Sequence, residues 1–287
     1  MNSVRIQRND LELFQEIGSG GFGRIYRARW LINDHIVAVK VLHSTHLNNE
    51  TRQIFFNELS ILNGVRHPNI VTFYGACLDD DWLALIMEYI PMGSLYQILH
   101  KEKLELSWPD RLAIALQAAK GLNHLHQQQP QILHRDIKSS NLLLENRHRE
   151  YYVKICDFGM AKTRDETIEQ TKGRFLEGCT LSWTAPEVLK LEPYTEQSDV
   201  YSLGIVYWEL ANCRIPYDGH QYCVIRESVI AGDRLKILTS TPLSFRDIIE
   251  QCWAQKPQDR PICVDLLRTL NECVEKQSKS RIFFLFY

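Results

Sequence analysis

The eight residues from His134 to Asn141 constrain the chain more than any other stretch. They read His-Arg-Asp-Ile-Lys-Ser-Ser-Asn and lie between an amphipathic run and a short apolar run. Such a loop offers a carboxylate at Asp136 that can accept a proton, a cation at Lys138 and an amide oxygen at Asn141 that can bind a metal ion. So short a match often arises by chance, and its weight depends on other motifs that follow in order along the chain.

A glycine-rich segment near the start of the chain predicts a hairpin that covers phosphate groups. Gly18, Gly20 and Gly23 fit the spacing G-x-G-x-x-G, which dinucleotide-binding folds also use. Residues 24–30 keep a period-two alternation, so we predict strand–turn–strand and not the helix of a dinucleotide fold. Glycines let backbone N–H groups approach phosphate oxygens without a side-chain clash. An ordinary hairpin and a dinucleotide-dependent oxidoreductase are the alternatives for this segment.

A lysine at the end of an apolar strand needs an anionic partner. Residues 36–39 are apolar and lead directly into Lys40, and burying an unpaired ammonium group is costly. Residues 48–62 carry an apolar stripe at helical spacing, and Glu58 lies on that stripe. We therefore predict an ion pair between Lys40 and Glu58, with a ligand phosphate as a second partner for the lysine. The alternative for Glu58 is a solvated acid at the edge of the stripe.

The pattern of the chain changes near its first third. Residues 1–87 predict mostly strands with one main helix, and residues 88–275 predict mostly helices, so we expect an α+β fold with two lobes. Residues 276–287 form a tail with an apolar end. Residues 145–150 are polar and predict an exposed turn. The segment 198–210 is apolar on most sides and predicts a buried central helix.

A second acid, Asp157, follows a predicted strand in the triplet Asp-Phe-Gly. From Gly159 to Ala185 the chain then lacks periodicity and carries several threonines with basic residues among them. Long polar segments in compact domains usually have a function, so we predict a functional loop there, with an ordinary surface loop as the alternative.

The bulk composition excludes several classes of function. A net charge of -2 gives no electrostatic reason to expect nucleic acid or a membrane surface as a partner. The eight cysteines include no C-x-x-C pair, which argues against zinc and for free thiols in a reducing compartment. No apolar run approaches the roughly 20 residues that span a bilayer. We see no signal peptide at residues 1–10 and expect a cytoplasmic protein.

In this order, and over residues 11–274, the motifs resemble those of the eukaryotic protein kinases. The phrases at 134–141, 154–159 and 198–202 look most like the tyrosine-kinase-like group, in particular mixed-lineage-type kinases. The resemblance implies a bilobal kinase fold with a strand-rich N-lobe and a helical C-lobe. It also implies transfer of the γ-phosphoryl group of ATP, with Mg²⁺, to Ser or Thr hydroxyls of a protein substrate. In a MAP kinase kinase kinase-like role, that substrate would be a downstream kinase.

The resemblance assigns roles residue by residue. The catalytic residues would be Asp136 as the base, Lys138, Lys40 and Glu58, and the metal ligands would be Asn141 and Asp157. The residues of the ATP site would be Ile17, Gly18, Ser19, Gly20, Gly21, Phe22, Gly23, Ile25, Ala38, Lys40, Met87, Glu88, Ile90 and Leu143. Within that site Met87 would be the gatekeeper, Glu88 and Ile90 would supply hinge backbone, and Ile25, Ala38 and Leu143 would enclose the adenine.

The same resemblance implies supporting contacts and a regulated loop. A regulatory spine would stack Leu62, Phe73, His134 and Phe158. Glu187 would pair with Arg260, and Asp199 would brace the catalytic loop. The candidate phosphorylation sites are Thr163, Thr167, Thr171 and Thr180, because a phosphate on this loop could pair with Arg135.

Two questions of function stay open in the sequence. Lys138 and the two serines after it favour serine/threonine specificity, whereas Trp-Thr-Ala-Pro-Glu at 183–187 is more familiar from tyrosine kinases. Dual-specificity and tyrosine kinases are therefore alternatives. A pseudokinase scaffold that binds partners without turnover is an alternative of another class. The sequence gives no indication of the oligomeric state.

Overall fold

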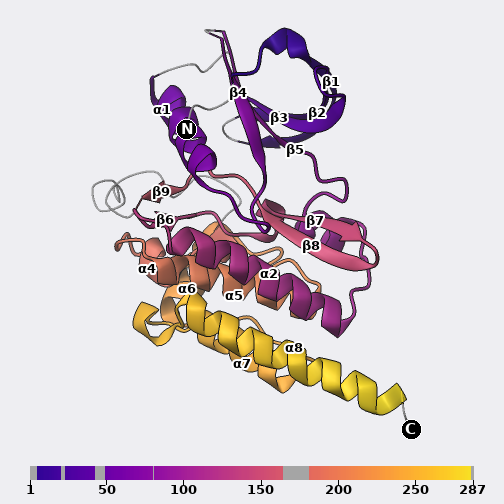
Figure 1. The fold of residues 1–287 in the computed structure, drawn as a ribbon. Coiled ribbons are helices and arrows are strands. Elements are labelled where there is room, and N and C mark those ends of the chain that lie inside the picture. The colour runs from indigo at the N-terminus through magenta and orange to yellow at the C-terminus, as the bar shows by residue number, and fades with distance from the viewer. Residues whose placement is uncertain (1–4, 21–22, 43–48, 80, 164–180, 286–287) are drawn as a thin grey trace.

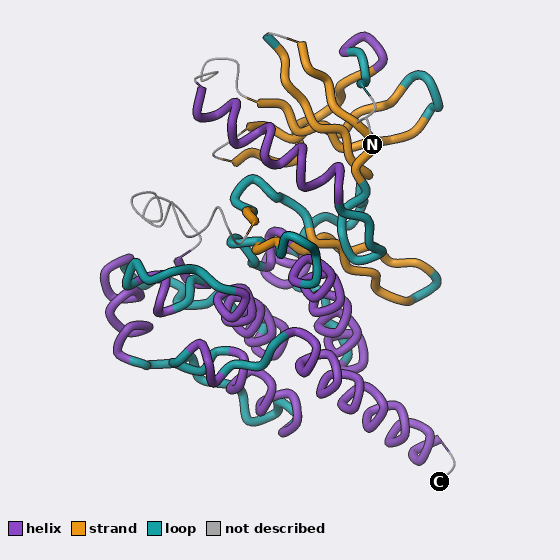
Figure 2. The backbone as a smooth tube through the Cα atoms, turned by 60° about the vertical axis from the view of Figure 1, so that its left-hand side comes forward, coloured by secondary structure: helices purple, strands orange, loops and turns teal. Residues whose placement is uncertain are grey.

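The chain folds into two lobes of different secondary structure. The structure is a computed structural model that describes residues 5–20, 23–42, 49–79, 81–163 and 181–285. Strands dominate the first lobe, and helices dominate the second, which lies below it in Figures 1 and 2. We call them the N-lobe and the C-lobe. The predicted α+β fold, with a strand-rich N-lobe and a helical C-lobe, is confirmed.

The N-lobe is built on one sheet of five antiparallel strands in the order β1-β2-β3-β5-β4. The strands are β1 (Leu11–Gly20), β2 (Gly23–Trp30), β3 (His35–Leu42), β4 (Phe73–Asp79) and β5 (Trp82–Glu88). The third glycine of the glycine-rich segment opens strand β2, as predicted, and not a helix. A Cβ atom on Gly23 would lie 2.2 Å from the Val41 carbonyl oxygen, so only glycine fits there.

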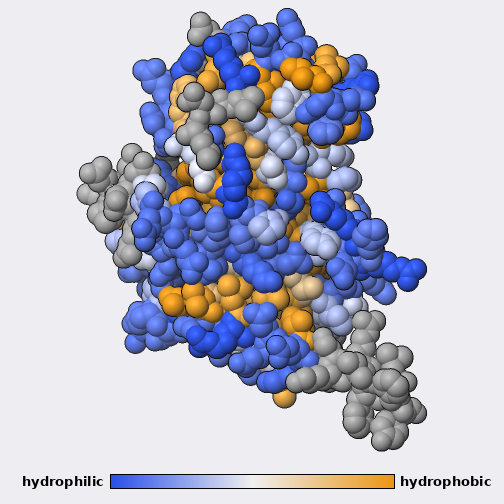
Figure 3. Space-filling view, viewed as in Figure 1, coloured by the Kyte–Doolittle hydropathy of each residue, from blue (hydrophilic) through white to orange (hydrophobic). Residues whose placement is uncertain are grey.

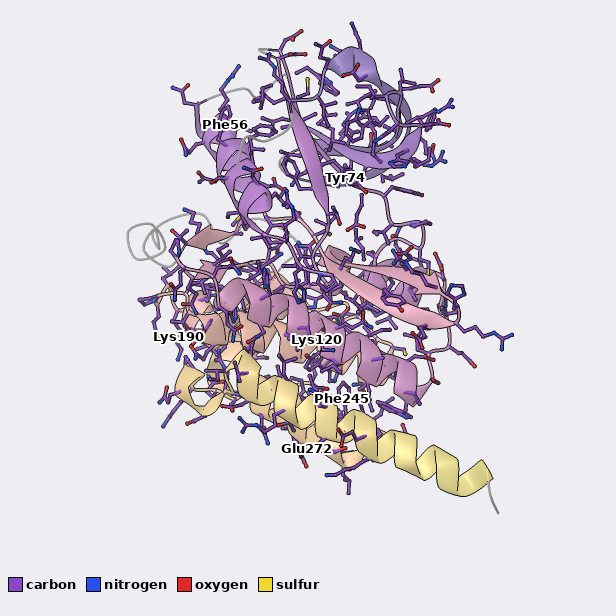
Figure 4. All side chains as sticks on the ribbon, viewed as in Figure 1. Phe56, Tyr74, Lys120, Lys190, Phe245 and Glu272 are labelled. Carbon is purple, nitrogen blue, oxygen red and sulfur yellow. The ribbon has the colours of Figure 1, made fainter. Side chains whose placement is uncertain are left out.

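One helix, α1 (Asn49–Gly64), accompanies this sheet, close to the helix predicted from the apolar stripe. Phe55 and Leu62 are buried and belong to the main core of the molecule. Phe56 of α1 is 43% exposed, and Tyr74 lies on β4 (Figure 4). The helix therefore turns its apolar face toward the sheet and the C-lobe, which holds Glu58 on the inner side.

The C-lobe is a stack of helices around one central helix. Its helices are α2 (Trp108–His126), α4 (Pro186–Leu189), α5 (Glu196–Asn212), α6 (Tyr222–Ala231), α7 (Leu243–Cys252) and α8 (Cys263–Leu285). Residues 198–212 of α5 are all buried, as the sequence predicted. Ser107 caps α2 in a reciprocal arrangement with Asp110. Helices α2 and α8 pack against each other, and hydrophobic residues gather where they meet (Figure 3).

Two small two-stranded sheets complete the C-lobe, and the second is a hairpin. Strand β6 (Ile132–Leu133) pairs with β9 (Lys162–Thr163), and β7 (Leu142–Arg147) pairs with β8 (Glu150–Ile155). The exposed turn predicted at 145–150 is wrong in extent, because β7 continues to Arg147 and β8 begins at Glu150. The hairpin tolerates polar residues here because every second side chain points to solvent. The helices within the described residues lack an apolar stretch of the length that a bilayer crossing requires.

Candidate active site

The strand register places four predicted site residues on one face of the N-lobe sheet. Ile25 pairs with Lys40, and Ala38 pairs with Met87. Paired residues of antiparallel strands share a face, as do residues two apart along a strand, so all four side chains point to the same side. Ile25 and Ala38 are half-buried there, as is Leu143 on β7. These apolar groups have the exposure expected of residues that enclose a flat ring.

Lys40 contacts two carboxylates from different parts of the chain. Its Nζ lies 2.8 and 2.9 Å from the Glu58 oxygens and 2.7 Å from Oδ1 of Asp157. The predicted pair with Glu58 is therefore confirmed, and the contact with Asp157 was not foreseen. Burial acts to lower the pKa of Lys40, but Asp157 and Glu58 together raise it above its ordinary value. Burial would raise the pKa of Asp157, yet Lys40 lowers it to about 2.

Asp136, Lys138 and Asn141 meet within the predicted catalytic loop. Lys138 Nζ lies 2.8 Å from Asp136 Oδ2. The side-chain nitrogen of Asn141 donates to the Asp136 carbonyl oxygen at 2.8 Å and to Asp136 Oδ2 at 2.9 Å. Both bonds use the amide nitrogen, so the side-chain oxygen of Asn141 is the atom suited to bind a metal. The cation and the amide of the predicted loop therefore both contact the carboxylate of Asp136.

Asp199 holds the backbone of this loop from the first turn of α5. Its carboxylate accepts the backbone N–H groups of His134 and Arg135, each at 2.9 Å. Arg135 has a φ of +67°, a left-handed conformation that a non-glycine residue adopts only when its surroundings enforce it. Asp199 itself is fully buried. The predicted bracing of the loop by Asp199 is confirmed, and it fixes the residue directly before Asp136.

The predicted spine and the predicted ion pair of the C-lobe are also visible. The His134 ring lies 5.1 Å from the Phe158 ring, measured between centroids. Leu62, Phe73 and Phe158 belong to one continuous hydrophobic cluster. Arg260 and Glu187 form the expected ion pair with N–O distances of 2.8 Å. The apolar cluster includes residues of α1, of β4 and of the segment after β8. The ion pair lies within the C-lobe.

Comparison with known proteins identifies the fold that carries this geometry. Residues 11–284 match the family model described as protein tyrosine and serine/threonine kinase. The chain belongs to this family. Serine/threonine-protein kinase CTR1 of Arabidopsis thaliana is 40% identical over 267 residues, which is 91% of this chain. Probable serine/threonine-protein kinase drkD of Dictyostelium discoideum is 35% identical over 274 residues, or 95% of the chain.

A further plant relative, probable serine/threonine-protein kinase SIS8 of Arabidopsis thaliana, is 34% identical over 98% of the chain. The chain is thus a kinase domain of the serine/threonine type, in agreement with the tyrosine-kinase-like group predicted from its motifs. It spans only 32%, 20% and 27% of the lengths of CTR1, drkD and SIS8. What those longer proteins do as wholes therefore does not transfer directly to this kinase domain.

The structure describes some of the remaining predicted site residues of the kinase domain, and others lie outside the described residues. Ile17 and Ser19 are exposed on β1, Gly18 is half-buried, and Gly20 pairs with Gly23. Thr163 pairs with Ile132 between β9 and β6. The predicted positions outside the described residues are Gly21, Phe22, Thr167, Thr171 and Thr180.

The hinge of the kinase domain contains an ion pair that sequence reasoning missed. The Glu88 N–H donates to the Thr72 carbonyl oxygen at 2.9 Å, and the Ile90 carbonyl oxygen accepts from Gly93 at 3.2 Å. The Glu88 carboxylate lies 2.7 Å from Lys154 Nζ. Lys154 lies on β8, so this pair joins the hinge to the C-lobe. A lysine in a strand that also carries buried valine and isoleucine was the signal that could have suggested a partner.

The donor atoms of the kinase domain fit a magnesium–nucleotide complex. Asp157 and Asn141 offer a carboxylate and an amide oxygen, the hard donors that Mg²⁺ prefers. No cluster of three or more His, Cys, Asp or Glu side chains suited to a metal occurs among the described residues. Magnesium in nucleotide sites is held by one or two protein groups together with phosphate oxygens. A sparse set of protein oxygens is therefore what such a site requires.

Proposed function

We propose that this domain transfers the γ-phosphoryl group of Mg²⁺–ATP to serine or threonine hydroxyls of protein substrates. The observation that carries the proposal is the convergence of two groups of residues. Lys138 and Asn141 both contact Asp136 within a single loop, and the backbone N–H of Cys156, next to Asp157, donates to the Asn141 carbonyl oxygen at 3.0 Å. Lys40 joins the N-lobe sheet to Asp157 at 2.7 Å. Phosphoryl transfer relies mostly on positioning and charge stabilisation, which this arrangement of charges is suited to supply.

Each residue of the proposed site has a distinct role. Asp136 accepts the proton of the acceptor hydroxyl as that oxygen bonds to phosphorus and ADP leaves. Lys138, 2.8 Å from Asp136 Oδ2, neutralises charge on the transferred group. Lys40, oriented by Glu58, holds the phosphates of the nucleotide. Mg²⁺ bound by Asp157 and Asn141 would neutralise the charge that develops on the phosphate oxygens.

The substrate class and setting extend the proposal. Lys138 and the serine/threonine kinases among the relatives support Ser/Thr acceptors, with dual specificity as the second candidate because of the Trp-Thr-Ala-Pro-Glu segment at 183–187. We assign the domain a cytoplasmic signalling role with a protein substrate, as for a kinase that phosphorylates a downstream kinase. The cysteines of the described residues are free thiols, which a reducing compartment maintains.

Regulation by phosphorylation is part of the same proposal. The candidate sites Thr163, Thr167, Thr171 and Thr180 precede the buried Glu187 in the chain. Arg135, directly before Asp136 in the catalytic loop, would be the partner of a phosphate on one of these threonines. Its guanidinium lies over the Tyr194 ring. Replacing Thr163, Thr167 and Thr171 together by alanine should lower kcat. Unchanged activity of that triple variant would rule out phosphorylation at these three sites as an activating event.

A peptide-array assay with Mg²⁺–ATP tests activity and acceptor type together. Matched peptides carry Ser, Thr or Tyr at the acceptor position, and wild type is compared with Asp136→Asn and with the exposed-site control Asp265→Asn. We expect transfer to Ser and Thr peptides that falls at least about 100-fold in Asp136→Asn and is kept in Asp265→Asn. Equal rates for wild type and Asp136→Asn would leave the scaffold as the better description, and transfer to Tyr peptides alone would exclude the Ser/Thr assignment.

A further inference from the structure

A chain of buried polar contacts leads from the start of α8 to the catalytic loop. Cys263 is the first residue of α8, and its Sγ lies 3.4 Å from Nδ1 of His126 at the end of α2. His126 Nε2 lies 2.9 Å from Asp199 Oδ2. The same Oδ2 atom accepts the backbone N–H of His134. Two side chains thus connect a thiol of α8 to the loop that carries Asp136.

The geometry limits the protonation states that His126 can adopt. Asp199 also accepts from the Tyr194 hydroxyl at 2.6 Å, and its carboxylate can only accept hydrogen bonds. His126 Nε2 must therefore carry a proton. Nδ1 then either accepts the weak S–H donor of Cys263 or carries a second proton and donates it to the sulfur. Whether the His126 ring carries one proton or two therefore depends on its contact with Cys263.

Three physical factors favour the doubly protonated ring. His126 lies in the last turn of α2, where the partial negative charge of the helix end stabilises a cation. Asp199 lies in the first turn of α5, where the opposite end of a helix stabilises an anion. His126 and Asp199 are both buried, and a buried carboxylate without a counter-ion is costly, so a positive charge on the ring compensates the negative charge of Asp199.

We propose that His126 is a positioning residue for phosphoryl transfer, kept doubly protonated between Asp199 and Cys263, and that it thereby fixes the backbone at His134 and Arg135. The inference rests on the proposed kinase function for its kinetic consequence, but not for the charge state of the ring. Burial would lower the pKa of His126, whereas Cys263 and Asp199 raise it to about 10. That direction agrees with the contacts.

Other titratable groups near the ring must be considered in any pH experiment. Tyr194 and Arg135 lie behind Asp199, and Arg135 stacks on the Tyr194 ring. Cys252 of α7 and Tyr207 of α5 interact electrostatically with Cys263. Burial raises the pKa of the Tyr194, Tyr207 and Cys252 groups, so they stay neutral while His126 would titrate. A change in the titration of His126 that depends on its contact with Cys263 can therefore be distinguished from titration of these three groups.

The chain offers a matched control for the thiol. Cys273 lies on the same helix α8, is as buried as Cys263, at 3% exposure each, and belongs to the same hydrophobic cluster, but Cys263 is the cysteine that contacts His126. Cys263→Ala and Cys273→Ala remove the same atom from the same helix. Only the first removes the acceptor for His126 Nδ1. Cys263→Ser keeps an acceptor, and Cys263→Val fills the space without one.

The first measurement is the protonation state of His126 by nitrogen-detected NMR from pH 6 to 10, assigned with His126→Gln. We expect a doubly protonated ring at pH 8 in the wild type and in Cys263→Ser and Cys273→Ala. In Cys263→Ala, or in Cys263→Val if alanine prevents folding, the pKa of the ring should fall by at least about one unit. A singly protonated ring in the wild type at pH 7.5 would overturn the proposal, whether or not the domain transfers phosphate.

The second measurement is the pH dependence of kcat for the same variants. If the ring pKa falls to ~8.5, only about a quarter of it is protonated at pH 9, so kcat of Cys263→Ala should fall about fourfold relative to Cys273→Ala. KM for ATP should stay unchanged, and Cys263→Ser should restore the wild-type profile. Superimposable profiles for Cys263→Ala and Cys273→Ala would overturn the positioning role. No phosphate transfer by the wild type would instead count against the proposed function.

Discussion

Arg260 and Glu187 face each other in a two-pronged ion pair inside the C-lobe. Nη1 and Nη2 of the arginine each lie 2.8 Å from one glutamate oxygen. The arginine side chain is fully buried and the glutamate side chain is 4% exposed. Ser198 Oγ donates to the same carboxylate at 2.7 Å. The pair fastens α4, which follows the segment 164–185, to the residues that lead into α8.

Removing one partner of this buried pair should be strongly destabilising. Arg260→Met leaves the Glu187 charge buried without its counter-ion, and we expect the free energy of unfolding to fall by about 3–5 kcal/mol. The matched control is Arg268→Met, which breaks an exposed ion pair with Asp265. The Arg268 side chain is 70% exposed and the Asp265 side chain is 52% exposed. That change should cost less than about 1 kcal/mol. Urea unfolding of both variants checks the prediction, and similar losses would contradict it.

A close approach of two helices disfavours any side chain at Gly204. A Cβ at this position of α5 would lie 2.7 Å from Cβ of Cys252 on α7, so Gly204→Ala should force the helices apart and cost about 1–3 kcal/mol. Gly64 at the end of α1 has no atom within 4 Å of the equivalent position. Gly64→Ala should therefore be neutral or stabilise by up to about 1 kcal/mol. Thermal unfolding of the two variants distinguishes them, and equal effects would argue against the helix contact.

Lys40→Met should abolish activity. The change removes the only cation that the described contacts give to Glu58, together with the partner of Asp157 at 2.7 Å. We expect kcat/KM to fall at least about 100-fold, because both nucleotide positioning and charge stabilisation are lost. A steady-state assay with Mg²⁺–ATP provides the measurement. Arg24→Met on the exposed side of β2 is the control and should keep its activity.

Stability should decline on the alkaline side through His126. Its pKa is raised to about 10 in the folded chain, against about 6.5 for an unfolded histidine. A raised folded pKa gives stabilisation that is complete below pH ~6.5 and is lost as the pH rises toward ~10. The difference in unfolding free energy between wild type and His126→Gln should therefore shrink over that window. Urea titrations at pH 6, 8 and 10 test this, and a constant difference would show that the imidazole carries no charge.

The sequence predicted the parts of the fold and site that depend on local patterns. The alternation after Gly23 distinguished a hairpin from a dinucleotide fold. The position of Glu58 on an apolar stripe predicted its pairing with Lys40, since a buried charge requires a partner. The spacing of Asp136 and Asn141 placed both in one loop. In each case the residues lie close together in the sequence, or one of them carries a charge that needs a partner.

Contacts between distant segments could not be predicted in the same way. The Lys40 bond to Asp157 joins residues 117 positions apart, and the Cys263 contact with His126 spans 137. Nothing in the local pattern around Cys263 distinguishes it from an ordinary buried thiol. The positive φ angles of Arg135 and Asp157 could not be predicted either, because most arginine and aspartate residues have a negative φ. Such features appear only when several elements enforce them together.

The complete burial of residues 198–212 in α5 has a consequence for how the domain opens. Backbone amides exchange with deuterated solvent only when their hydrogen bonds break, and those of a helix enclosed on every side require the whole C-lobe to unfold. Local opening of the N-lobe sheet alone would leave α5 protected. Hydrogen–deuterium exchange measured by mass spectrometry should therefore be slowest in α5. Exchange in the N-lobe without exchange in α5 would indicate local opening of the nucleotide-facing lobe, whereas exchange in α5 would indicate global unfolding.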